Sequence, residues 1–298
     1  MGLKETVDHS VIAPLPEGSQ FDWSDIWWVG DISYIFRVYF ESFVATESDF
    51  AVKTIDAVSN VIMWVLEQHP AMAFIALDSG TSKRREIYPS YKSNRASKTA
   101  EFWAAYDAML RDLGYNFVSE GLQIVAAEGW EADDVMATLV TQAVARNNRC
   151  ILMTQDKDMR QSLVPGMVTT QRRTNDSMGR PVWGWMTCSD AEDNWGVTPD
   201  KFIDFQILNG DSTDGIPGCK GVGDVTARKL LDEHGSIAGI KAAMENGRFK
   251  GVMQKNLSEW FPMEPITRQL VTLRTDVDLQ NVIFDDGVIP RFLGFPVF

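Results

Sequence analysis

The order of hydrophobic and polar positions predicts strands and helices that alternate along the chain. Short apolar runs at residues 26–30, 71–77 and 150–154 are typical of strands buried on both faces of a sheet. Apolar residues at spacings of three and four predict helices at residues 50–69 and from Glu131 to about residue 146. This alternation favours an α/β fold with a parallel sheet.

The rest of the pattern predicts shorter elements. Helices are expected at residues 34–43 and 99–113, and Gly114 is expected to end the second helix as a C-cap. Residues 116–118 suit a short strand. The polar, turn-rich stretch 165–185 predicts a hairpin or a loop.

The two ends of the chain carry no clear periodicity. Residues 1–24 contain Pro14, Pro16 and Gly18 and predict a loosely ordered leader without the layout of a signal peptide. The apolar, aromatic tail at residues 290–298 is expected to pack back on the core, and a partner-docking peptide is the alternative. No apolar run approaches the roughly 18 residues that a membrane-spanning helix needs.

Composition narrows the class of protein. The chain has 298 residues, 45% hydrophobic, which is ample for one large domain or two small ones. Its 3 cysteines are widely spaced and form no CxxC, so a reducing cytoplasm is expected. The 3 histidines show no ligand spacing, which argues against a zinc site.

Three carboxylates stand close together where a helix is predicted to begin: Glu131, Asp133 and Asp134. The positive end of the helix dipole favours acids there, so an ordinary acidic first turn is one explanation. One or two acids are enough for capping, however, and crowded carboxylates repel unless protons or metal ions hold them. The stretch therefore predicts the centre of a divalent-metal site.

More aspartates follow the predicted strands. Asp31 and Asp78 come directly after two buried runs, at the edge where parallel sheets bind ligands. A turn or N-cap aspartate is the alternative for each. Asp156 and Asp158 follow the run at 150–154, where an N-cap accounts for one of them but not for both. These acids add candidates to the metal site.

A basic segment at residues 81–98 stands out because the formal net charge of the chain is −13, which argues against a polyanionic partner. Tyr88 and Tyr91 lie among its basic residues, and only Glu86 opposes them. Basic residues interleaved with aromatics suit phosphates and unstacked bases, and a solvated loop is the alternative. The basic residues are Lys83, Arg84, Arg85, Lys92, Arg95 and Lys98.

A glycine-rich turn follows two further aspartates. Asp211 and Asp214 are three residues apart at a helix end and could face the same metal ion. Residues 216–223 then form a turn before a helix that contains residues 226–231. Glycines let phosphates approach backbone N–H groups, and a helix N-terminus favours negative charge. The pattern favours a helix-hairpin-helix phosphate grip over an ordinary turn between helices.

Together these motifs resemble the 5′-nuclease family: the 5′→3′ exonuclease domain of bacterial DNA polymerase I, bacteriophage 5′-exonucleases and flap endonucleases. The resemblance covers roughly residues 26–231 and implies an α/β, PIN-like parallel sheet flanked by helices. It also implies a helical arch at about residues 81–110 and a helix-three-turn-helix that grips DNA. The corresponding division is a leader at 1–24, a nuclease domain at 25–195, and a helix-hairpin-helix subdomain with the tail at 196–298.

The resemblance assigns roles to single residues. It implies two Mg²⁺ ions, with Mn²⁺ as a substitute, and K⁺ at the hairpin turn. Arg84 and Lys92 would steady the scissile phosphate, with Asp133 and Asp156 as the other catalytic residues. The first metal group would be Asp31, Asp78, Glu131 and Asp133, with Asp134 nearby, and the second Asp156, Asp158, Asp211 and Asp214. The DNA-binding residues would be Arg85, Tyr91, Arg95, Gly218, Lys220, Gly221, Gly223, Thr226, Arg228 and Lys229.

The implied function is metal-dependent 5′→3′ exonuclease and 5′-flap endonuclease activity in DNA replication or repair, giving 5′-phosphate and 3′-hydroxyl products. The expected partner is DNA with 5′ ends, flaps or nicks, and the protein is expected to be a monomer. No polymerase domain follows in the sequence, which favours the free-standing, bacterial or bacteriophage form of the family. The alternatives are a catalytically silent DNA-binding module and a nuclease of the same fold that acts on RNA–DNA hybrids.

Overall fold

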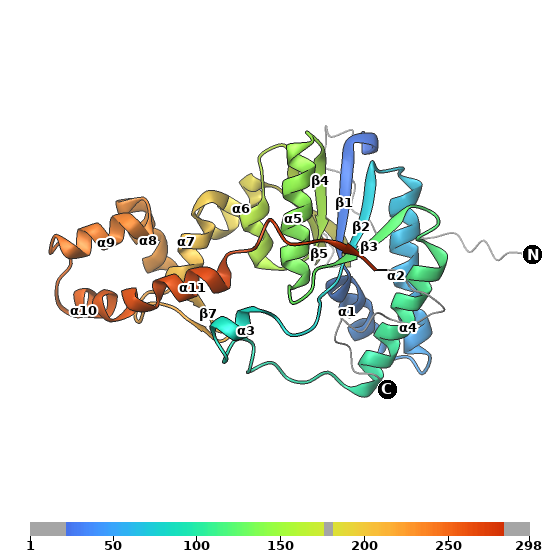
Figure 1. The fold of residues 1–298 in the computed structure, drawn as a ribbon, viewed down its shortest axis with the longest axis horizontal. Helices are drawn as coiled ribbons and strands as arrows, with labels where there is room; N and C mark the ends of the chain where they lie inside the picture. Colours follow the sequence, from blue (N-terminus) through green and yellow to red (C-terminus); the bar gives the residue numbers. More distant parts are fainter. Residues whose placement is uncertain (1–21, 176–180, 283–298) are drawn as a thin grey trace, which may run out of the picture.

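A seven-stranded, mostly parallel sheet forms the centre of the computed structural model, which describes residues 22–175 and 181–282. Its strand order is β6-β5-β4-β1-β2-β3-β9, and β1 to β5 are labelled in Figure 1. The interior strands run parallel, and β6 and β9 are antiparallel additions at the two edges. The strands are β1 Ile26–Asp31, β2 Met72–Ala76, β3 Leu122–Ala126, β4 Arg149–Met153, β5 Val168–Asn175, β6 Pro181–Met186 and β9 Gln280–Asn281.

Helices cover both faces of this sheet because alternate residues of each buried strand point to opposite sides. In β1, Trp28 packs against one face with α1 (Ile32–Phe43), α2 (Phe50–Glu67) and α4 (Ala100–Asn116). Its neighbours Trp27 and Val29 pack against the other face, where α5 (Ala132–Ala145) lies. The predicted α/β class, with a parallel sheet flanked by helices, is confirmed.

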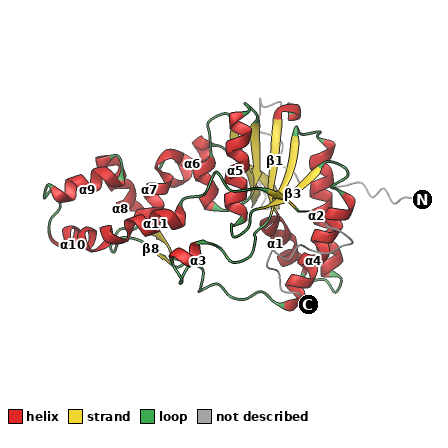
Figure 2. Cartoon of the chain, viewed as in Figure 1, coloured by secondary structure: helices red, strands yellow, loops and turns green. Residues whose placement is uncertain are grey.

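The C-terminal part is helical and extends to one side of the sheet (Figures 1 and 2). It has its own apolar core, which includes Phe205, Leu231 and Trp260. Two-residue strands β7 (Gly210–Asp211) and β8 (Ile216–Pro217) pair within it. Its helices are α6 Cys188–Trp195, α7 Pro199–Asn209, α8 Asp224–His234, α9 Ile237–Glu245, α10 Gly251–Trp260 and α11 Glu264–Val271. Short 3₁₀ turns are η2 Trp23–Asp25, η3 Lys157–Ser162 and η4 Phe261–Met263.

The predicted helical arch differs in the structure. Only the four-residue helix α3 (Arg84–Ile87) precedes a run of turns, and α4 packs on the sheet instead of arching away from it. Residues 88–99, here called the strap, cross from α3 to α4 without helix. The strap is held to the C-terminal part by Lys92 N–H, which donates to Asp214 O at 2.9 Å, and by the Asn94 amide, which donates to Ser212 O at 2.9 Å. These two contacts, one from the backbone and one from a side chain, favour turns over helix in the strap.

The end of α4 also differs from the prediction. The helix continues through Gly114 to Asn116, so Gly114 is not a C-cap and residues 116–118 are not a strand. Leu113 is fully buried in the core, and the Asn116 amide donates to the Asp112 carboxylate at 2.8 Å. These contacts hold the last turn in place against the roughly 1 kcal/mol that glycine costs inside a helix.

A hairpin was one of the two structures predicted for residues 165–185, and β5 and β6 form it. The turn between these strands, residues 1–21 of the predicted leader and the predicted apolar tail at 290–298 lie outside the described residues. Within the described part of the chain, no helix is both long enough and apolar enough to cross a membrane.

Replacing Gly218 by alanine should destabilise the fold by about 3 kcal/mol, because the backbone there leaves no room for a side chain. A Cβ on Gly218 would lie 2.3 Å from the carbonyl carbon and oxygen of Asn209. Gly223 is the matched control, because a Cβ there meets nothing within 4 Å, and Gly223→Ala should cost less than about 1 kcal/mol. Urea unfolding of both variants measures the difference, and equal stabilities would contradict this steric account.

Candidate metal centre

Carboxylates from three adjacent strands meet at the carboxyl edge of the sheet. Asp31 ends β1, Asp78 follows β2 and Asp156 follows β4, and these strands are neighbours in the order β4-β1-β2. Asp31 accepts hydrogen bonds from Tyr34 N at 3.0 Å and from Thr154 Oγ1 at 3.3 Å. Parallel strands therefore bring together acids that lie far apart in the sequence.

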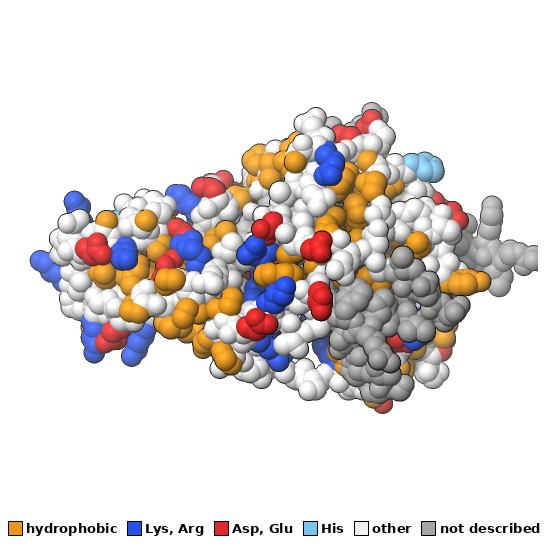
Figure 3. All heavy atoms as spheres, in the orientation of Figure 1, with side chains coloured by type: hydrophobic (Ala, Val, Ile, Leu, Met, Phe, Trp, Pro, Cys, Tyr) orange, Lys and Arg blue, Asp and Glu red, His pale blue; other side chains and the backbone are white. Residues whose placement is uncertain are grey.

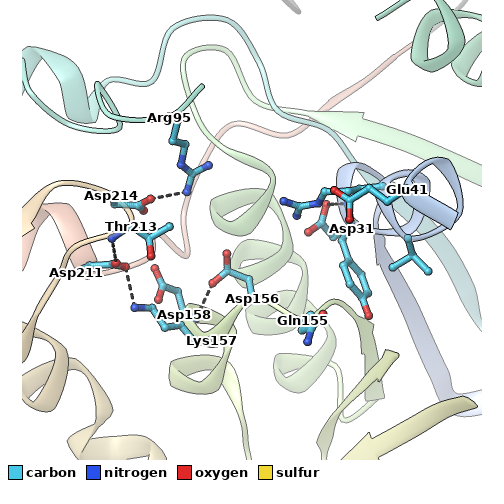
Figure 4. Close-up of a pocket in the computed structure, with 13 residues that line it drawn as sticks. Asp31, Glu41, Arg95, Gln155, Asp156, Lys157, Asp158, Asp211, Thr213 and Asp214 are labelled. Atoms are coloured by element: carbon cyan, nitrogen blue, oxygen red, sulfur yellow. Dashed lines mark hydrogen bonds and ion pairs between the residues drawn. The ribbon is translucent and has the colours of Figure 1, made fainter. Parts of the chain in front are cut away.

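The C-terminal part adds two buried aspartates. Asp211 and Asp214 come from β7 and the turn after it, and each offers an oxygen to the same small volume as Asp158 of η3. The three oxygen atoms lie within 4.8 Å of one another. In Figure 4, these carboxylates and Asp156 face a cavity of about 520 Å³. An all-oxygen donor set of this kind suits Mg²⁺ or Mn²⁺.

Crowding changes the ionisation of several of these acids. Burial, then repulsion from Asp78 and Asp156, raises the pKa of Asp31 to about 7. Burial and repulsion from Asp156 raise the pKa of Asp158 to about 7 as well. The pKa of Asp133 is raised well above its usual value by burial and then by Asp156 and Asp31. Bound cations would relieve this repulsion and keep the acids ionised.

Basic side chains are paired with the remaining acids. Lys157 Nζ lies 2.9 Å from Asp211 Oδ2, and Arg95 forms an ion pair with Asp214 (Figure 4). Lys92 Nζ lies 2.7 Å from Glu131 Oε1. Burial alone would raise the pKa of Glu131, but Lys92 and Arg84 outweigh it and hold that pKa below its usual value.

The first predicted metal group is less tightly gathered than the second. Asp78 accepts a hydrogen bond from Ala132 N at 2.9 Å, and together with Glu131 it lines a neighbouring cavity of about 700 Å³. Arg37 and Arg95 line both cavities and so mark their border. Of this group, Asp31 therefore lines the same cavity as the cluster of Asp158, Asp211 and Asp214, whereas Asp78 and Glu131 line the neighbouring cavity.

Asp134 is a structural residue, which corrects its predicted place near the metal ions. It is fully buried, and both of its oxygens are occupied. Oδ1 accepts from Arg84 Nη2 at 2.7 Å and from Arg274 N at 2.8 Å. Oδ2 accepts from Arg84 Nη1 at 2.5 Å and from Glu131 N at 3.3 Å. These four bonds use all the acceptor positions of the carboxylate, so none is open to a metal ion.

Arg84 is structural for the same reason, which corrects its predicted contact with the scissile phosphate. Its side chain is 3% exposed, and its guanidinium also donates to Leu270 O at 2.8 Å and Thr272 O at 3.2 Å. Burial opposes its charge, but Asp134 and Glu131 outweigh this effect and raise the pKa of Arg84. The guanidinium therefore stays charged and committed to protein partners.

Tyr91 is also buried, which corrects its predicted contact with DNA. The residue is 3% exposed and packs in the C-terminal core, and its hydroxyl donates to Glu131 Oε2 at 2.8 Å. Arg95 of the strap and Arg85 of α3 are exposed, so these two predicted contacts remain open to a ligand.

The predicted phosphate grip lies at the turn before α8. Gly221 and Gly223 are exposed, and Gly221 has φ of +77°, whereas half-buried Gly218 is packed against backbone. Lys220 and Lys229 are exposed, while Thr226 and Arg228 are half-buried. On the face drawn in Figure 3, Lys and Arg side chains are spread over the helical part and its border with the sheet, interspersed with acids.

Sequence reasoning did not single out three residues of this site. Lys157 stands between two candidate aspartates, which was a usable signal. Arg37 of α1 lines both cavities, and its only signal was a basic residue in an apolar helix. Gln206 of α7 donates to Asp158, and its only signal was a polar residue between buried Phe205 and Ile207.

Two family descriptions match the chain in succession. A 5′-3′ exonuclease N-terminal, resolvase-like domain matches residues 29–183, and a 5′-3′ exonuclease C-terminal SAM fold matches residues 197–286. DNA polymerase I of Rhizobium leguminosarum is 31% identical over 222 residues, covering 73% of this chain and 20% of that protein. DNA polymerase I of Mycobacterium leprae is 34% identical over 237 residues, covering 74% and 25%. The chain thus spans a fifth to a quarter of these two relatives.

Solved structures share the fold. The T5 5′-exonuclease, solved with bound zinc ions, has a TM-score of 0.63 at 20% identity, covering 83% of this chain and 88% of that one. Human GEN1, solved in complex with Holliday junction DNA, has a TM-score of 0.57 at 18% identity, covering 86% and 63%. At these identities the likeness concerns the arrangement of the elements.

Proposed function

The chain belongs to the 5′-3′ exonuclease family, and we propose that it hydrolyses phosphodiester bonds of DNA at 5′ ends and 5′ flaps with the help of divalent metal ions. The observation that carries this proposal is the convergence of carboxylates from the sheet edge and from the C-terminal part in one cavity. The family and the class of enzyme agree with the resemblance stated from the sequence.

The donor set fits two divalent ions. Asp158, Asp211 and Asp214 would hold one ion, with Asp156 beside them, and Asp31, Asp78, Glu131 and Asp133 would surround the other. When bound, such ions supply a hydroxide nucleophile near neutral pH and stabilise charge on the leaving oxygen. Mg²⁺ is the proposed ion and Mn²⁺ its substitute, because both prefer oxygen ligands.

The side chains have separate tasks in this proposal. The aspartates hold cations, so the site needs no histidine base. Lys92 and Arg95 lie at the border of the carboxylates, where their charges can stabilise a phosphate. Gly221, Gly223 and the exposed lysines around them would hold the duplex backbone without reading its sequence, with K⁺ at the same turn.

DNA is the proposed substrate because the fold recurs in proteins solved with DNA, including a bacteriophage T5 flap endonuclease in complex with DNA and metal ions. A catalytically silent binding module is disfavoured, since seven of the predicted ligands line the two cavities and Asp133 interacts electrostatically with three of them. An RNA–DNA hybrid is the second candidate substrate, and the assay includes it.

One assay panel tests the proposal. A 5′-labelled flap, a nicked duplex, a single strand and an RNA–DNA hybrid are each incubated with Mg²⁺ or with EDTA. We expect cleavage of the flap and of 5′ ends with Mg²⁺ only, leaving 5′-phosphates and 3′-hydroxyls. Cleavage of the hybrid alone would assign the site to RNA removal. Flap binding without metal-dependent cleavage of any substrate would support the silent module instead.

Lys92→Ala should slow flap cleavage about a hundredfold and change flap affinity less than about threefold. The reason is that Lys92 contributes a charge at the carboxylate border, where phosphate charge develops, rather than a large contact surface. Single-turnover rates and flap binding in Ca²⁺ measure the two effects. Lys53→Ala is the control, because Lys53 belongs to α2, which packs on the face of the sheet. An unchanged rate in Lys92→Ala would remove this residue from the site.

A further inference from the structure

Gln206 of α7 points its side-chain amide at the carboxylate cluster. Its Nε2 donates to Asp158 Oδ1 at 2.5 Å, and Asp158 shares a small volume with Asp211 and Asp214. Gln206 is 3% exposed and comes from the C-terminal part, whereas Asp158 belongs to η3, directly after the sheet. The hydrogen bond therefore crosses between the two parts of the molecule.

A buried glutamine at position 206 is unfavourable for the stability of the fold. Its neighbours Phe205 and Ile207 are buried, and its carbonyl Oε1 has no hydrogen-bond partner among the described residues. Leaving a buried polar atom unsatisfied lowers stability, so an apolar residue of the same size would pack better. The donor that Gln206 gives to Asp158 accounts for its presence.

The contact between Gln206 and Asp158 has a counterpart that also crosses between the two parts of the molecule, and the two donors come from opposite sides. Lys157, from the sheet side, is paired with Asp211 of the C-terminal part at 2.9 Å, and Gln206, from the C-terminal part, donates to Asp158 of the sheet side. The two donors differ in charge. Lys157 neutralises its acid, whereas the neutral amide of Gln206 orients Asp158 and leaves its negative charge available to a cation.

We propose that Gln206 is a positioning residue that holds the Asp158 carboxylate toward Asp211 and Asp214, so that α7 completes the metal site. This inference rests on the proposed function, because it requires that the cluster binds a divalent ion. Residues that orient a metal ligand through a hydrogen bond typically change metal affinity 10- to 100-fold when they are removed.

The test measures Mn²⁺ binding to the full chain without DNA by titration calorimetry. Gln206→Met keeps the size of the side chain and removes the donor, and we expect the Kd for Mn²⁺ to rise about 10- to 100-fold. Gln254→Met in α10 is the matched control, because the buried carbonyl oxygen of Gln254 also has no hydrogen-bond partner in the described part of the chain, and α10 lies at the end of the helical part away from the sheet (Figure 1). Its Mn²⁺ affinity should equal that of the wild type.

A double-mutant comparison separates positioning from general structure. In an Asp158→Asn background, Gln206→Met should cause no further loss of Mn²⁺ affinity, because its effect acts through Asp158. An additive loss, or an unchanged affinity in Gln206→Met alone, would overturn the inference while the metal site stands. A wild type that binds no Mn²⁺ would overturn the proposed function together with it. If Gln206→Met does not fold, Gln206→Asn, one methylene shorter, allows the same comparison.

Discussion

Asp133→Asn is expected to abolish metal-dependent cleavage of a 5′ flap and to leave flap binding nearly unchanged. Asp133 stands in the first turn of α5, and its carboxylate interacts electrostatically with Asp156, Asp31 and Asp158, which belong to both proposed metal groups. We therefore propose that Asp133 serves both metal positions. Losing one anionic ligand should remove about 4 kcal/mol of transition-state stabilisation, a rate loss of roughly a thousandfold.

The same loss is expected for Asp156→Asn, which lines the cavity beside the cluster. Flap affinity measured in Ca²⁺ should change little, because the proposed grip on the duplex uses the turn before α8 and exposed basic residues, not the carboxylates. Asp56→Asn is the control, since Asp56 is an exposed aspartate of α2, a helix that packs on the face of the sheet. Full cleavage activity in Asp133→Asn or Asp156→Asn would contradict the proposed metal site.

The position of the centre could be predicted because it depends on chain topology. Asp31, Asp78 and Asp156 follow apolar runs, and the carboxyl ends of parallel strands meet at one edge whatever the details of packing. The turn before α8 was also predictable, because its glycines indicate a turn in which side chains do not cover the backbone. Local patterns therefore sufficed wherever a role followed from the order of the elements.

The roles of Arg84, Asp134 and Tyr91 could not be predicted from local sequence patterns. Arg84 is buried because Leu270 and Thr272, 186 and 188 residues further along the chain, present their carbonyl groups to it. Nothing near Arg84 in the sequence distinguishes it from exposed Arg85. Whether a charged residue faces a ligand or the protein is decided by such distant partners, and Gln206 escaped notice for the same reason.

Breaking the Arg84–Asp134 pair is expected to destabilise the protein by about 3–5 kcal/mol, because each single substitution leaves a buried charge without its partner. Arg84→Met would strand the fully buried carboxylate of Asp134, and Asp134→Leu would strand the guanidinium. Urea unfolding in EDTA measures the loss independently of metal binding. Arg85→Ala, at the next and exposed position of α3, should change stability by less than about 0.5 kcal/mol.

The double variant Arg84→Met with Asp134→Leu distinguishes a structural pair from a catalytic one. It removes both charges, so it should lose at least about 2 kcal/mol less than the sum of the single losses. Recovery will be incomplete, because Leu270 O, Thr272 O and Arg274 N each lose a hydrogen-bond partner. If Arg84 instead acted on the scissile phosphate, Arg84→Met would keep its stability and lose its cleavage rate. That outcome would restore the role first expected of Arg84.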